Sequence, residues 1–154
     1  MSALAPTRWQ PLADLPARAW RGVGGVFTDI DDTLTTEGAI TPDALAALHR
    51  LHSAGLPVFA ITGRPAGWSE AFALAWPVNA IVAENGAVAL SRASDGQLNK
   101  IYLQAEPVRR ANFARLQAVA QHILHTLPQA RLATDSAGRE TDIAIDHSEF
   151  AHLG

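Results

Sequence analysis

Three carboxylates crowd into four residues near the start of the chain, at Asp29, Asp31 and Asp32. They follow Val26–Thr28, an apolar run typical of a strand, so we expect the strand to end where the acids begin. Side chains two positions apart on a strand share a face, and Asp29 and Asp31 are therefore predicted to converge. Converging carboxylates repel each other unless a cation or a shared proton lies between them. Mg²⁺, which prefers oxygen ligands, is the expected occupant.

Two other interpretations of this acidic segment remain. An Asp-rich turn can cap a helix, and clustered acids can bind calcium in a loop. The segment lacks the glycine and the terminal glutamate of an EF-hand loop, which argues against calcium.

A second strand-like run, Pro57 to Ile61, ends in Thr62, Gly63 and Arg64. A threonine hydroxyl beside main-chain N–H groups at a strand-to-helix turn makes an anion site. Glycine lets the backbone approach a phosphate closely. Arg64 has two interpretations, as a substrate contact or as a side chain that pins its own loop. Alone, the Thr-Gly pair also fits an ordinary strand-to-turn junction, but two such segments in order favour a phosphate site.

The string Asp29-Ile30-Asp31-Asp32-Thr33 resembles the first signature of the haloacid dehalogenase-like (HAD) phosphohydrolases. The resemblance implies that Asp29 is a nucleophile that forms an aspartyl-phosphate, and that Asp31 acts as general acid and then as general base. It also implies that Mg²⁺ is held by the Asp29 carboxylate and the Asp31 main-chain carbonyl.

The resemblance extends to the segments that follow. It places three residues at the bound phosphate: Asp32, Thr62 and Gly63. Arg64-Pro65 and the string Glu84–Ala87 resemble the large-cap subfamily IIB, which includes sugar-phosphate phosphatases. We interpret Glu84 and Asn85 first as hinge residues between core and cap. Asn85, like Arg64, is a second-choice candidate for contact with the substrate.

Strands and helices alternate through the first part of the chain. Thr41 and Pro42 are typical of a helix start and Gly55 of its end, and residues 67–75 fit a second helix. Residues 80–83 resemble a third strand. This order implies parallel strands joined by right-handed crossovers. We therefore predict an α/β fold with an incomplete, Rossmann-like parallel sheet as its core. Ligands of such sheets bind at the carboxyl ends of the strands, where the acids and Thr62 lie.

Beyond residue 87 the pattern changes to short strands around one long helix. The expected elements are strands at 88–90 and 101–103, a helix at 107–126, and two strands at 130–133 and 141–145 around a turn at 136–138. This order resembles the first half of an α+β cap. We therefore divide the chain into residues 1–87, the amino-terminal part of a HAD core with the nucleophile and phosphate-binding loops, and residues 88–154, a partial cap domain.

The family pattern contains two parts that this sequence lacks, a lysine that neutralises phosphate and a Gly-Asp-x-x-x-Asp segment that completes the magnesium site. Lys100 is the one lysine, and we expect an exposed surface side chain; the less favoured alternative is that Lys100 is the lysine that neutralises phosphate. Asp142 and Asp146 are interpreted as the polar ends of a strand. We expect the amino-terminal part of a longer phosphatase, weakly active or inactive alone, with an exposed sheet edge through which it forms a homodimer.

The composition excludes several function classes. Cysteine is absent, which rules out disulfides and thiol chemistry, and the net charge of −3 includes no basic stripe for nucleic acid. No long apolar run indicates a membrane span, so a cytoplasmic protein is expected. The leading hypothesis is a magnesium-dependent phosphomonoester hydrolase acting on a small phosphorylated metabolite. The alternatives are a non-catalytic phosphate- or metal-binding relic and, less favoured, a phosphorelay receiver.

Overall fold

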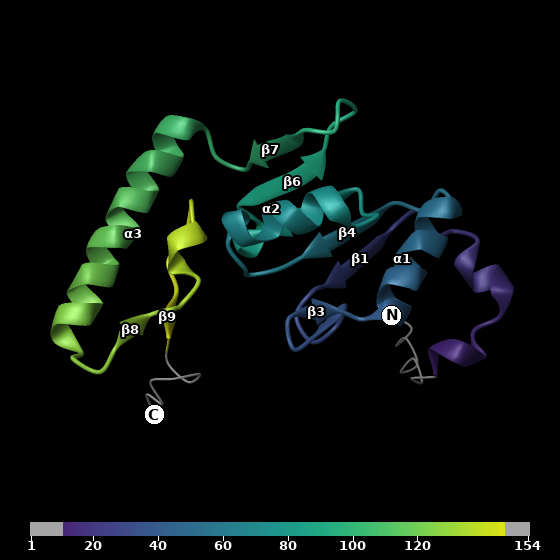
Figure 1. The fold of residues 1–154 in the computed structure, drawn as a ribbon, viewed down its shortest axis with the longest axis horizontal. Coiled ribbons are helices and arrows are strands. Elements are labelled where there is room, and N and C mark those ends of the chain that lie inside the picture. Colours follow the sequence, from purple (N-terminus) through teal and green to yellow (C-terminus); the bar gives the residue numbers. More distant parts are fainter. Residues whose placement is uncertain (1–10, 147–154) are drawn as a thin grey trace, which may run out of the picture.

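The structure is a computed structural model that describes residues 11–146, and a five-stranded sheet runs through its centre (Figure 1). The strand order is β1-β4-β5-β6-β7, and the strands are β1 (Val26–Asp29), β4 (Val58–Ile61), β5 (Ala80–Ala83), β6 (Val88–Arg92) and β7 (Leu98–Tyr102). The first three pair in parallel, and β6 and β7 continue the sheet in antiparallel fashion. The predicted α/β class with a parallel, Rossmann-like core is confirmed.

Two helices cover one face of the sheet. In α1 (Pro42–Ser53) the Thr41 hydroxyl accepts a hydrogen bond of 3.4 Å from the N–H of Ala44, which confirms the expected helix start. The second helix is α2 (Ala66–Ala75). The core between helices and sheet contains these buried side chains: Leu48 from α1, Ala73 from α2, Val58 and Ala60 from β4, Ile81 from β5 and Leu90 from β6.

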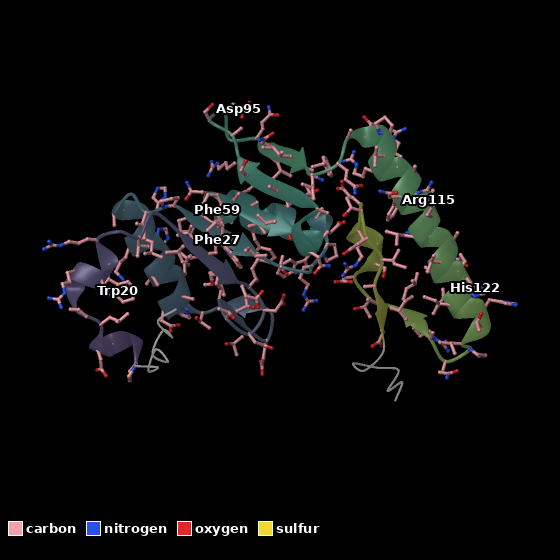
Figure 2. All side chains as sticks on the ribbon, turned by 180° about the vertical axis from the view of Figure 1, so that it is seen from behind. Trp20, Phe27, Phe59, Asp95, Arg115 and His122 are labelled. Carbon is pink, nitrogen blue, oxygen red and sulfur yellow. The ribbon has the colours of Figure 1, made fainter. Side chains whose placement is uncertain are left out.

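The opposite face of the sheet carries apolar side chains that no described helix covers. Successive strand residues point to opposite faces, so Phe27 on β1 and its register partner Phe59 on β4 both lie on this side. Their rings stack at 5.2 Å between centroids, and Phe27 is 71% exposed. Figure 2 views the molecule from this side and shows both rings in front of the sheet.

Between β1 and α1 the chain forms a short hairpin of β2 (Thr35–Thr36) and β3 (Ala39–Ile40). The two turn residues, Glu37 and Gly38, both have positive φ, as the tight turns of hairpins require. This hairpin forms a small flap between the first acidic segment and α1.

A long helix, α3 (Glu106–Thr126), extends away from the sheet and returns through β8 (Arg131–Leu132) and β9 (Ile145–Asp146) (Figure 1). The expected helix is confirmed. The strand expected at 141–145 begins only at Ile145, and the N–H of Thr141 donates to the Glu84 side chain instead of to a strand. No helix within residues 11–146 combines the length and apolar character that crossing a bilayer requires.

The sheet passes without interruption through the proposed boundary between residues 87 and 88, since β5 pairs with β6. The division into core and cap therefore stays a prediction.

Candidate active site

The three parallel strands end at one edge of the sheet, and each is followed by a segment that the sequence singled out. Asp29 is opposite Ile61 in the register, and the N–H of Thr62 donates to the Val82 carbonyl at 2.9 Å. The loop after β5 joins the loop after β4, because the N–H of Glu84 donates to the Arg64 carbonyl at 3.0 Å. The expected clustering at the carboxyl edge is therefore present.

Asp31 is the centre of the polar contacts at this edge. The Thr62 hydroxyl donates to its Oδ2 at 3.3 Å, and Arg64 approaches its Oδ1 through both Nε and Nη2 at 3.0 Å. The Arg64 guanidinium also lies 3.8 Å from Asp135 and 5.6 Å from the centre of the Trp68 ring. Of the two interpretations of Arg64, the structure shows the pinning contact, and substrate contact stays a prediction.

Asp29 differs from Asp31 in its surroundings. Asp29 is exposed, and within residues 11–146 no side chain or backbone N–H donates a hydrogen bond to its carboxylate. An exposed carboxylate that accepts no hydrogen bond from the described residues is accessible to an incoming electrophile or cation. Asp32 is exposed too and has a positive φ of 55°, a conformation that aspartate tolerates better than most residues.

The Thr62-Gly63-Arg64 turn is held from several sides. The Thr62 hydroxyl accepts from the Arg64 N–H at 3.0 Å, and the Gly63 carbonyl accepts from Arg139 at 3.1 Å. A Cβ added at Gly63 would lie 3.1 Å from the Asn85 side-chain oxygen, so the lack of a side chain allows this close packing.

A cavity of about 300 Å³ opens beside Asp31. One wall comes from the strand-end loops and the other from the segment after β8, with lining residues Asp31, Gly63, Arg64, Ala133, Thr134, Asp135 and Arg139. Two guanidinium groups and two carboxylates therefore line a space of metabolite size, and the guanidinium groups are the ones suited to an anionic ligand. Asp29 is not among the lining residues.

Glu84, interpreted from the sequence as a hinge residue, is a buried hydrogen-bond acceptor, a role that the sequence interpretation did not include. Glu84 is 2% exposed, and its carboxylate accepts from the N–H groups of Ala66 at 2.9 Å, Glu140 at 2.9 Å and Thr141 at 2.7 Å. The Thr141 hydroxyl donates to it as well. A glutamate that follows an apolar strand without a break is the signal that could have indicated burial.

Arg139 is the second functional candidate that was missed. Its side chain is 7% exposed and pairs with Asp135 at 3.3 Å and Asp142 at 2.8 Å. Burial alone lowers the pKa of Arg139, but the hydrogen bond and charge of Asp142, aided by Asp135, outweigh it and raise the pKa. The spacing of these acids, four before and three after the arginine, was the available signal. Asp142 also accepts from Asn85 at 3.0 Å.

Lys100 departs from the expected exposed lysine. It is half-buried on β7, where its ammonium contacts Glu140 at 2.6 Å and Glu70 at 2.7 Å. Burial would lower the pKa of Lys100, but the hydrogen bonds that its ammonium donates to Glu140 and Glu70 outweigh burial and raise the pKa. Since β7 and β1 are at opposite edges of the sheet, Lys100 does not neutralise charge beside Asp29.

The donor set at the acidic edge suits magnesium in its chemistry. Asp29 offers an uncommitted carboxylate, and Asp31 offers a main-chain carbonyl, both hard oxygen donors. Within residues 11–146 no group of three or more His, Cys, Asp or Glu side chains is placed to hold a metal. A Mg²⁺ ion here would therefore keep several water ligands, as this ion commonly does.

Comparison with known proteins identifies the family of this chain. The family model described as haloacid dehalogenase-like hydrolase matches residues 26–135, which include all three strand-end segments. The chain belongs to this family. None of the curated proteins compared with this haloacid dehalogenase-like chain matches it.

Solved structures agree on the fold. A Thermoplasma acidophilum protein, 0175, is 19% identical with a TM-score of 0.58, over 80% of this chain and 51% of its own. A structure described among the phosphatases of the haloalkanoate superfamily, from Bacteroides thetaiotaomicron, is 20% identical with a TM-score of 0.51, over 92% of this chain and 56% of its own. This haloacid dehalogenase-like chain thus spans about half the length of these structures.

Proposed function

We propose that this chain provides the nucleophile and phosphate-binding loops of a magnesium-dependent phosphomonoester hydrolase. The substrate class is a small phosphorylated metabolite such as a sugar phosphate, and the type is the large-cap subfamily. The supporting observation is the contact of Asp31 with Thr62 and Arg64 at the ends of adjacent parallel strands. These groups border a cavity with two guanidinium groups, and the exposed Asp29 carboxylate ends the neighbouring strand.

In the proposed reaction the Asp29 carboxylate attacks phosphorus, and the bond from phosphorus to the substrate oxygen breaks. Asp31 gives its proton to that leaving oxygen. Asp31 then removes a proton from a water molecule, which attacks the aspartyl-phosphate and releases inorganic phosphate and the Asp29 carboxylate. Mg²⁺ held by Asp29 and the Asp31 carbonyl would screen the repulsion between carboxylate and phosphate.

In this scheme Arg64 takes both of its interpreted roles in turn, first as a contact that holds Asp31 and then as a contact to the substrate phosphate. In the structure its guanidinium is bound to Asp31, whose carboxylate must carry a proton to act as an acid. A phosphate entering the cavity is a better bidentate partner for Arg64 than a single carboxylate oxygen. Transfer of Arg64 from Asp31 to the phosphate would release the Asp31 carboxyl to contact the leaving oxygen, while Thr62 and the Gly63 turn bind the remaining phosphate oxygens.

A second candidate function is a non-catalytic relic that binds phosphate or metal without turnover. Two observations favour it: the Asp31 carboxylate is already ion-paired, and the described residues supply no third acidic ligand to the metal site. Loss of one carboxylate ligand leaves the repulsion between Asp29 and the phosphate less screened.

The test is phosphate release from a panel of sugar phosphates, with and without Mg²⁺, for the chain and its Asp29→Asn variant. Asp95→Asn is the matched control, because Asp95 lies in the β6–β7 turn, away from the strand-end edge (Figure 2). Magnesium-dependent release that disappears only in Asp29→Asn supports the hydrolase. Equal release by the two variants contradicts it. Binding of inorganic phosphate without turnover supports the relic.

A further inference from the structure

A second cavity, of about 380 Å³, lies where the first turns of α3 meet the segments that follow β5 and β7. Arg109, Asn112 and Arg115 line it from α3, and Leu103 and Thr141 line it from the other side. None of its lining residues belongs to the cavity beside Asp31. The two cavities are therefore distinct sites.

The charged side chains that line this second cavity are both positive, while its amides bond to each other, Asn112 donating to Gln104 at 3.0 Å. Arg109 and Arg115 supply two guanidinium groups, Asn112 and Gln104 supply amides, and no lining residue is acidic. Two acids lie near the cavity without lining it, and both are already hydrogen-bonded: Glu140 to Lys100 and the Tyr102 hydroxyl, and Glu84 to the backbone N–H groups of Ala66, Glu140 and Thr141. The net field in the cavity thus favours a negative charge.

Arg109 has one buried donor nitrogen that lacks an acceptor among the described residues. Its guanidinium stacks on the Tyr102 ring at 3.4 Å, which fixes its plane. Its Nη1 is buried and has no hydrogen-bond partner within the part of the chain that the structure describes. A buried charged donor without an acceptor destabilises the fold, so an anion bound beside it would gain a preoriented partner.

The remaining walls are apolar. Leu103 is 81% exposed at the rim, and Ala87 and Leu116 lie with it along the lining. An exposed leucine beside two arginines suits a ligand with an anionic end and an apolar body. We propose that this cavity binds a small organic anion, a phosphate or carboxylate carried on an apolar or aromatic body, at a site separate from the Asp31 cavity.

The site also has a local reporter. Thr141 lines the cavity, and its N–H donates to the buried Glu84 carboxylate at 2.7 Å. An anion in the cavity changes the field at this hydrogen bond, so the Thr141 amide resonance is expected to shift on binding.

The experiment titrates phenyl phosphate into the isotope-labelled chain in EDTA, which removes divalent metal and prevents turnover, and follows amide shifts by NMR. Benzoate tests the carboxylate form of the ligand, inorganic phosphate tests charge without a body, and phenol tests the body without charge. We expect phenyl phosphate or benzoate to shift the Thr141 amide and to bind at least tenfold more tightly than phenol. Equal binding of phenol overturns the proposal, as does the lack of any shift with either anion.

Three variants locate the binding. Arg109→Gln and Arg115→Gln are each expected to weaken binding tenfold or more, and Arg115, which is exposed, keeps the test valid if loss of the Tyr102 contact unfolds the first variant. Arg110→Gln is the matched control, because Arg110 is on the same helix but outside the lining and pairs with Glu106 at 2.6 Å. A uniform loss across all three overturns a specific site.

A further variant tests whether the anion binds in the Asp31 cavity instead of in the second cavity. In Arg64→Ala, the Asp31 cavity loses a guanidinium while the second cavity keeps its lining. Binding that survives in Arg64→Ala and is lost in Arg115→Gln supports the proposal, whether or not the chain is a hydrolase. The reverse pattern assigns the anion to the Asp31 cavity and overturns it.

Discussion

At the scale of single residues, Glu84 shows how one buried carboxylate joins segments that are far apart in the sequence. Its oxygens accept from Ala66 at the start of α2 and from Glu140 and Thr141 more than fifty positions later. Backbone N–H groups that are removed from water need such acceptors. Glu84 therefore places the segment carrying Arg139 against the loop that carries Thr62.

Replacing Glu84 with alanine is expected to destabilise the fold strongly. The change leaves three backbone donors without their acceptor, and each unsatisfied buried group costs about 1–3 kcal/mol, so we expect a loss of about 3 kcal/mol or more. Chemical denaturation measures the free energy of unfolding, with Glu106→Ala as control. Glu106 takes part in an exposed pair, worth about 0.5 kcal/mol at most. Equal losses in the two variants would contradict the role of Glu84.

The surroundings of Glu140 lead us to predict that the free energy of unfolding depends on pH. Burial alone raises the pKa of this carboxyl, but hydrogen bonds from Lys100 and Tyr102 outweigh burial and lower the pKa from its ordinary value of 4.5. A folded-state pKa below the unfolded one means that Glu140 stabilises the fold above pH 4.5, and that this contribution is lost as the pH falls through the folded value. The free energy of unfolding should therefore decline below pH 4.5.

The control for this pH dependence is Glu140→Gln. The variant is expected to be less stable than the natural chain at pH 7, and the difference should close in acid, where Glu140 is protonated. A difference that stays constant from pH 7 to pH 3 would show that charge at Glu140 does not matter.

At the scale of elements, two glycines set the distance between α2 and the turn after β8. A Cβ added at Gly138 would lie 3.2 Å from the Pro65 Cβ, and one at Gly67 would lie 3.3 Å from the Gly138 backbone. Pro65 is fully buried, so it cannot move away easily. The close approach positions Arg139 beside the Gly63 carbonyl.

Gly138→Val is expected to push this turn away from α2. The Glu140 and Thr141 amides would then exchange faster with solvent, and hydrogen exchange measured by NMR would report it. Ala137→Val is the matched control, because Ala137 is exposed in the same turn. Slow exchange at both amides in Gly138→Val would show that the contact does not hold the segment.

Local sequence patterns predicted the helices and strands better than they predicted the contacts between those elements. Thr41 and Pro42 marked the start of α1, and apolar runs ending in polar residues marked β1, β4 and β5, because these depend on neighbouring residues. The hydrogen bonds that Glu84 accepts from Glu140 and Thr141, and the one that Arg139 donates to the Gly63 carbonyl, join positions far apart, and no local pattern encodes such pairs. The strand expected over 141–145 begins only at Ile145, and at Thr141 the backbone N–H donates to the distant Glu84 side chain, a contact of this long-range kind.

At the scale of the whole molecule, the sheet has one covered and one uncovered face. The helices α1 and α2 pack on the first, while Phe27, 71% exposed, and Ile101, 62% exposed, lie on the second. On the free side of β1 no described strand pairs with it, so its backbone groups are open to another chain. An apolar face that continues into an open edge suits pairing with a second copy.

We therefore predict that the chain self-associates through β1 and the face carrying Phe27. Burying one large apolar side chain stabilises an interface by about 1.5–3 kcal/mol. In a two-fold symmetric dimer each such side chain contributes twice, once from each copy. Sedimentation velocity should show a concentration-dependent dimer that Phe27→Asp abolishes. Val119→Asp, at a half-exposed valine on α3, should leave the dimer intact. A natural chain that stays monomeric at every concentration, or a dimer that survives Phe27→Asp, would assign no role to this face in self-association.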